Sequence, residues 1–210
     1  MAVQVGVTRE SPGGMLAEML AGHRLFFANL YALLRFLEAE VTKRGWELVK
    51  NGGYAVTRNG AGRGLMNFAS ADWVTTQMGI AFAAQGLTRF TQGVTNTDIP
   101  AQGLELLFFQ ARWLEKSAEE PVIWHGRLRI EAEGSTPLKK WEEYQSMVFS
   151  RLEPEMRPDG TRSGSIKPGR ASVSGAALVY TGTYAEVPVA SLLSQEDVVS
   201  QLLEPALIQS

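Results

Sequence analysis

The sequence predicts an α+β fold, with a mainly antiparallel sheet packed against a long N-terminal helix and two shorter helices. Apolar residues recur at three- and four-residue steps over residues 15–43, which is typical of a helix. Apolar and polar residues alternate over residues 122–133, which is typical of a half-buried antiparallel strand. Helix-start residues then stand at Thr136 and Ser194, with strand-like segments between them.

The N-terminal helix is the strongest pattern in the chain. It is expected over residues 15–43, after a breaker cluster at residues 11–14 and before a C-cap at Gly45. At 1.5 Å per residue it would be roughly 40 Å long. Because residues 25–37 are apolar on nearly every face, the rest of the domain or a second copy is expected to cover the helix. His23 lies on the apolar stripe, where a histidine in the core or hydrogen-bonded between helices is favoured over a catalytic or switch role.

The segments after this helix are expected to form the first part of the sheet. Residues 46–49 and 54–57 predict two strands, joined by a hairpin-type turn at residues 50–53. Residues 65–85 fit either a helix or a buried strand. Residues 86–102 contain two glycines, a proline and many threonines, and we expect them to be irregular.

The central pair of strands is expected at residues 104–114 and 122–133, with an exposed turn at residues 115–120. One row of the second strand is expected to face water and consists of Ile123, His125, Arg127, Arg129 and Glu131. The other row is expected to face the core and consists of Val122, Trp124, Gly126, Leu128, Ile130 and Ala132. This arrangement predicts that His125 lies on a solvated or groove-lining face.

A second helix is expected after the N-cap Thr136 and Pro137. Its core stripe is Leu138, Trp141, Tyr144, Val148 and Leu152. Residues 153–169 are polar and rich in proline and glycine, which predicts a long mobile loop.

The C-terminal part predicts one or two strands and a final helix. The strand segment is residues 171–184, with breaks expected at Gly175 and Gly182. The final helix is expected to start at the capping-box-like residues 194–197 and to end near Pro205. We expect residues 1–210 to form a single domain, of which residues 1–13 are a loose N-terminal segment.

The composition limits the function classes. Twenty Lys and Arg against 22 Asp and Glu give a formal charge of −2, which disfavours a protein that neutralises many phosphates. The chain has no cysteine and only two histidines, so thiolate nucleophiles, Fe–S clusters, Cys-based zinc sites and His-rich metal sites are excluded. The chain lacks the basic start and apolar run of a signal peptide, and residues 25–37 are too short to span a bilayer. We expect a cytoplasmic location, no membrane partner and no cofactor.

One candidate catalytic pair is Glu131 and Glu133, at the end of a strand and followed by Lys139, Lys140 and Gln145. Strand-borne carboxylates can hold Mg²⁺ for phosphodiester hydrolysis. The order of elements here resembles the PD-(D/E)xK nuclease core, which implies a metal-dependent nuclease or an inactive relative. The lysine of that motif is replaced by Glu133, and only Asp72 and Asp98 precede it as aspartates. An ordinary solvated strand end is the favoured interpretation.

A candidate anion site is the glycine-rich loop that consists of Arg58, Gly60, Gly62, Arg63 and Gly64. Backbone amides at glycines and forked arginine donors suit a phosphate or nucleotide. The spacing matches neither the dinucleotide fingerprint nor the P-loop, so a surface turn is favoured.

A basic loop is formed by Arg157, Arg162, Lys167 and Arg170, against the single acid Asp159. It leaves open a contact with an acidic partner or an RNA backbone. No aromatic residue is interleaved to stack bases, so a solvated loop is favoured.

The leading interpretation is a non-catalytic interaction or assembly protein that self-associates through its N-terminal helix. The expected interface residues are Phe26, Phe27, Leu30, Leu33, Leu34 and Leu37. Nucleophile and metal constellations are missing from the sequence, while this helix carries more apolar surface than a core helix of three turns needs. The alternatives are the metal-dependent phosphodiesterase and a small anionic-ligand binding domain.

Overall fold

The structure, a computed structural model, describes part of the 210-residue chain. The described residues are 12–49, 54–57, 75–91, 94–100, 102–112, 120–133, 141, 144–149, 151–153 and 163–208. They belong to two units, residues 1–37 and residues 38–210, and each unit is described by itself. Helix α1 (Pro12–Thr42) supplies the first unit and reaches into the second. Gly45, with a φ of 85°, follows its end.

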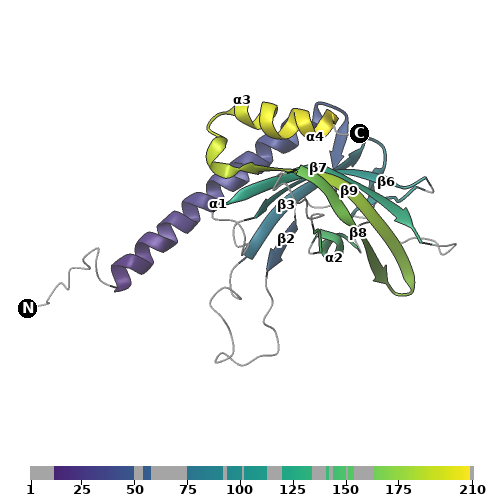
Figure 1. Ribbon diagram of the computed structural model, residues 1–210, viewed down its shortest axis with the longest axis horizontal. Helices are drawn as coiled ribbons and strands as arrows, with labels where there is room; N and C mark the ends of the chain where they lie inside the picture. The colour runs from purple at the N-terminus through teal and green to yellow at the C-terminus, as the bar shows by residue number, and fades with distance from the viewer. Residues whose placement is uncertain are drawn as a thin grey trace, which may run out of the picture. The chain divides into compact units, whose positions relative to one another are not determined.

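An antiparallel sheet is the centre of the second unit (Figure 1). Its strands are β1 (Trp46–Leu48), β2 (Tyr54–Thr57), β3 (Thr75–Ala84), β6 (Leu104–Arg112), β7 (Val122–Ala132), β8 (Ser163–Val173) and β9 (Ala176–Pro188). The order is β1–β3–β6–β7–β9–β8, and β2 pairs with β3 beside β1. The α+β class and the antiparallel sheet are therefore confirmed.

Two predictions for the first strands are wrong. β1 and β2 do not pair with each other: β1 pairs with the end of β3 at Phe82–Ala84, and β2 pairs with its start at Thr75–Gly79. The ten residues of β3 offer partners along their whole length, so both short strands line up along one side of it. The expected irregular region instead contains a two-stranded sheet of β4 (Thr88–Thr91) and β5 (Val94–Thr97). Its threonines are β-branched and suit strands.

The predicted central pair is confirmed, because β6 and β7 pair antiparallel from Leu104↔Ile130 to Arg112↔Val122. The predicted break at Gly175 is also present, as the turn between β8 and β9. Ser174 and Gly175 both have positive φ, 49° and 83°, which is the geometry of a two-residue hairpin turn.

Two expectations about β8 and β9 are corrected. The chain does not break at Gly182, which lies inside β9 opposite Leu128. A Cβ there would come within 2.2 Å of the carbonyl oxygen of Arg127, so glycine permits close approach of β7 and β9. The expected loop over residues 153–169 is shorter, because Ser163–Gly169 pairs with β9. Residues 154–162 lie outside the described residues.

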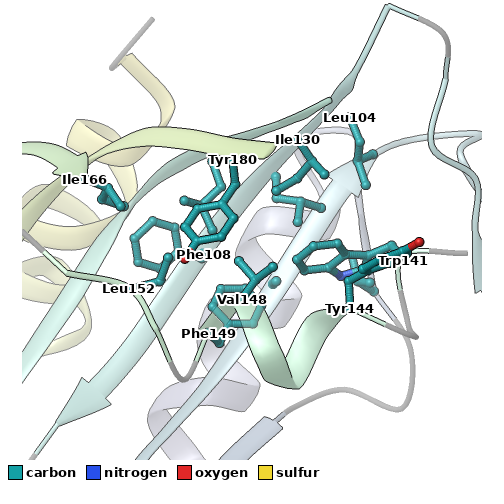
Figure 2. Close-up of a cluster of buried hydrophobic side chains, with 14 of the residues drawn as sticks. Leu104, Phe108, Ile130, Trp141, Tyr144, Val148, Phe149, Leu152, Ile166 and Tyr180 are labelled. Atoms are coloured by element: carbon teal, nitrogen blue, oxygen red, sulfur yellow. The ribbon is translucent and has the colours of Figure 1, made fainter. Parts of the chain in front are cut away.

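Helix α2 (Gln145–Phe149) covers one face of the sheet (Figure 2). The predicted stripe residues Trp141, Tyr144, Val148 and Leu152 are all buried there. They pack with strand residues that include Leu104, Phe108, Ile130, Ile166 and Tyr180. The N-cap Thr136, Pro137 and Leu138 lie outside the described residues.

The final helix lies on the opposite face of the sheet from α2 (Figure 1). It consists of α3 (Gln195–Val198), the π-helical η5 (Val199–Leu203) and α4 (Glu204–Ile208), after the short η4 (Val189–Ser191). The predicted capping box is confirmed: Ser194 accepts from the Asp197 amide, and the Asp197 carboxylate accepts from the Ser194 amide. The helix passes Pro205 rather than ending there. Since proline lacks an N–H, the wider turn of η5 just before it accommodates the missing bond.

Within the described part of the chain, no helix has the length and apolar character that a membrane span requires.

Candidate functional site

The N-terminal helix carries the candidate interaction surface. Of the six residues expected at an interface, Leu30, Leu34 and Leu37 are buried in the single chain, with exposed fractions of 5%, 9% and 0%. Phe26, Phe27 and Leu33 are half-buried. The three leucines, at three- and four-residue steps, are therefore covered, whereas Phe26, Phe27 and Leu33 keep part of their side chains exposed.

Among the α1 side chains that the structure describes, the large apolar ones with the greatest exposure are ones that the sequence pattern did not single out. Leu25 is 64% exposed and Tyr31 is 65% exposed. Ala21, Ala28 and Ala32 are also exposed. Because Leu25 and the three alanines lie opposite the buried leucines on the helix, α1 has a second apolar side that faces solvent. Both sides of α1 are apolar, and they differ in the exposed fraction of their side chains.

Aromatic rings contact one another on α1. The ring centroids of His23 and Phe27, four residues apart, are 4.5 Å from each other, and those of Phe26 and Phe27 are 5.3 Å apart. His23 is exposed, so it is not a core histidine, and its alternative role in a hydrogen bond between helices stays a prediction. The helix leaves this part of its apolar stripe open to solvent, which sequence periodicity alone does not reveal.

The candidate acidic pair forms ion pairs with arginines. Nε of Arg129 donates to the Glu131 carboxylate at 2.5 Å, and this hydrogen bond raises the pKa of Arg129. Arg170 donates to the Glu133 carboxylate. Among the described residues, no three His, Cys, Asp or Glu side chains gather as metal ligands do. Asp98 is described, whereas Asp72, Lys139 and Lys140 are outside the described residues, and Gln145 lies buried in α2.

The other two candidates are only partly described. Arg58, Gly60, Gly62, Arg63 and Gly64 of the glycine–arginine loop lie outside the described residues, as do Arg157, Asp159 and Arg162 of the basic loop. Lys167 and Arg170 are on strand β8 rather than in a loop. Lys167 pairs with Glu153 at 3.1 Å and Arg170 with Glu133, so each cation has an acidic neighbour within the chain.

A row of polar side chains crosses the sheet on the face that α2 covers. Gln110, Trp124 and Glu186 are cross-strand neighbours on β6, β7 and β9. The indole Nε1 of Trp124 donates to the Glu186 carboxylate at 3.1 Å. Nε2 of the fully buried Gln110 donates to Oε1 of Gln77 on β3 at 2.8 Å. Single-sequence reasoning missed these residues because their partners are 33 and 62 positions away in the chain.

His125 lies on the other face of β7 and is 1% exposed, so the prediction that it faces water is wrong. Its ring stacks on Phe109 with centroids 6.5 Å apart. No described residue is within hydrogen-bonding reach of its Nδ1. Burial lowers the pKa of His125 from 6.5 to about 4, so the ring is neutral near pH 7. A buried, neutral imidazole of this kind is a core residue rather than a catalytic base in contact with solvent.

Arg127 lies on the same face of β7 as His125 and holds the final helix against that face. Its Nε donates to the carbonyl oxygen of Ala206 at 3.1 Å, and Nη2 donates to that of Leu207. Nη1 pairs with Glu105 at 2.5 Å. The guanidinium thus satisfies carbonyls at the end of α4, where a positive charge also suits the helix dipole. Arg127 is therefore a structural anchor for the final helix.

Comparison of the chain with known protein families, with curated proteins and with solved structures found no match.

Proposed function

We propose that this chain is a non-catalytic interaction protein of the cytoplasm, which associates with a second copy of itself through helix α1. The observation that carries the proposal is the exposure of Leu25 and Tyr31, 64% and 65%, on one helix. Covering apolar surface contributes about 25 cal/mol per Å², so a partner that buried these side chains would be stabilised by them. Cyclic homodimers are the commonest oligomers of soluble proteins.

The proposed surface differs from the one that the sequence pattern indicated. Leu30, Leu34 and Leu37 are buried and are not offered to a partner. The proposed contact uses Leu25 and the exposed Ala21, Ala28 and Ala32, with Tyr31 beside them on the helix. It requires α1 to be one helix over the length given above, so that these side chains share a regular surface.

The two alternatives from the sequence draw no support from the described residues. Glu131 and Glu133 each accept from an arginine, which competes with a cation for the carboxylate oxygens. The glycine–arginine loop is outside the described residues. Both alternatives, and the cytoplasmic location, stay predictions.

Light scattering on the full chain tests the proposal. We expect a dimer whose mass falls toward that of a monomer in Leu25→Glu, because the substitution places a charge in the contact. Leu193→Glu is the matched control, since Leu193 is 86% exposed and lies outside α1. A wild-type chain that is monomeric from about 1 to 100 µM, or equal effects of the two substitutions, contradicts the proposal.

A further inference from the structure

His125 lies between the two points at which the final helix and the segment before it are attached to β7. At one point, the amide of Val189 in η4 donates to the carbonyl oxygen of Pro121 at 2.9 Å, next to the start of β7. At the other, Arg127 donates to the carbonyl oxygens of Ala206 and Leu207. Since the final helix lies on this face of the sheet, it covers the stretch of β7 that contains the buried His125 (Figure 1).

The surroundings of His125 are apolar. Its cross-strand neighbours are Phe109 of β6 and Ala185 of β9, and the Phe82 ring packs edge-on against Phe109. The buried residues of the final helix are also apolar: Val198, Leu202, Leu203 and Ala206. A charge on the imidazole would therefore lose its hydration without gaining an acceptor from these side chains.

Among the described residues, no charged side chain forms an ion pair with His125, and burial is the cause that lowers its pKa. On the same face of the sheet, Arg127 pairs with Glu105, and Arg129 pairs with Glu131. The acids of the final helix are the exposed Glu196 and Glu204 and the capping residue Asp197. Those at the end of α1 are the half-buried Glu38 and Glu40, of which Glu40 pairs with Lys43 and Arg44. Protonation of His125 would thus add a positive charge two residues from Arg127, which is a like charge.

Different contacts hold the two ends of the final helix. The start is held by the capping box of Ser194 and Asp197 and by Gln201, whose Oε1 accepts from the Ser191 hydroxyl at 3.1 Å. Hydrogen bonds from Ser194 hold the pKa of Asp197 below its usual range, so this cap stays ionised near pH 5. Arg127 holds the far end. The π-helical η5 lies between the two ends, and helices bend at such turns.

We infer that the far end of the final helix, residues 203–208, is an acid-sensitive lid, which opens when His125 takes up a proton while α3 stays in place. In the open state, water can hydrate the charged ring, so a falling pH favours opening. Opening would uncover Phe109 and its apolar neighbours, which form a surface that the closed helix hides. The inference does not depend on the proposed self-association.

Hydrogen exchange of the full chain at about pH 7 and about pH 5, corrected for the intrinsic exchange rate, tests the lid. Protection of the amides in residues 203–208 should fall about tenfold to twentyfold at the lower pH. This ratio follows from a pKa of about 4 in the closed state and 6.5 in water. Amides of α3 and β6 should keep their protection. An equal loss in all segments, or unchanged protection of residues 203–208, would overturn the inference.

Two variants separate His125 from general effects of acid. His125→Phe should keep residues 203–208 protected near pH 5, because phenylalanine cannot take up a proton. Arg127→Met should lower their protection at both pH values, because the donor to Ala206 and Leu207 is lost. A fall in His125→Phe as large as that of the wild type would assign the effect to another group and overturn the lid. If His125→Phe loses the wild-type circular dichroism, the contrast between segments in the wild type decides alone.

Discussion

Arg127 in the middle of the sheet holds the end of the final helix, because its Nε donates to the carbonyl oxygen of Ala206 at 3.1 Å. The same guanidinium also bonds to Leu207 and Glu105, and 20% of the side chain is exposed. One residue thus joins a strand, a helix end and a neighbouring strand. His125, two residues earlier on the same face, is buried.

Replacement of Arg127 is expected to loosen the final helix. Arg127→Met keeps the apolar stem but leaves two helix carbonyls without their donor, and should lower the free energy of unfolding by about 2–3 kcal/mol. Urea denaturation followed by circular dichroism measures the change. Arg129→Met is the matched control on the same strand face, and loss of its more exposed pair with Glu131 should lower the free energy of unfolding by less. Equal losses in the two variants would refute the anchoring role.

The burial of His125 predicts a specific dependence of stability on pH. Its pKa is about 4 when folded against an ordinary value of 6.5, so the unfolded chain binds the proton first as the pH falls. The free energy of unfolding that the neutral, buried His125 contributes is fully present above pH 6.5 and is lost as the pH falls toward 4. The total loss is about 3 kcal/mol. Urea midpoints of the wild type and of His125→Phe, taken at several pH values in this window, measure it. The same pH dependence in both proteins would show that His125 is not responsible.

Glycine at position 182 is expected to be required for the contact between β7 and β9. A methyl group there would lie 2.2 Å from the carbonyl oxygen of Arg127, so the strands would have to separate. Gly182→Ala should destabilise the protein by about 1–3 kcal/mol, as overpacking does. Thermal unfolding checks the value. A variant as stable as the wild type would mean that the strands have room for a side chain.

Gly22→Ala is expected to stabilise the protein, in contrast to Gly182→Ala. The site lies on a helix, and a Cβ there meets nothing within 4 Å. Alanine favours a helix interior by about 1 kcal/mol relative to glycine, so the helical signal in circular dichroism should persist to higher temperature. Loss of helical signal in this variant would contradict the assignment of residue 22 to the interior of α1.

The elements that the sequence predicted well are those whose signals are local. The capping box at Ser194 and the buried residues Trp141, Tyr144, Val148 and Leu152, in and around α2, both arise from local patterns. The alternation in β7 predicted the strand and the burial of Val122, Trp124, Gly126, Leu128 and Ile130, whereas Ala132 of the same row is exposed. Hydrophobic periodicity, helix caps and turn residues each depend on a few neighbouring positions, so the elements they mark can be predicted from one sequence.

The errors arose where a distant segment decides the outcome. His125 shares a row with Arg127, Arg129 and Glu131, which indicates a solvated face, but the final helix covers this face near the middle of β7. The hairpin expected for β1 and β2 was wrong because β3 pairs with both. For the candidate interface, apolar character alone could not tell Leu37, which is fully buried, from Leu25, which is 64% exposed.

The measurement that tests the central claim most directly is hydrogen exchange of the α1 backbone amides at several protein concentrations. Association at the exposed side of α1 should slow exchange over residues 18–35 as the concentration rises, because binding suppresses local opening. Amides of β6 and β7 serve as the internal reference. The account predicts slower exchange in α1 that disappears in Leu25→Glu, and exchange in α1 that stays the same at all concentrations would contradict it.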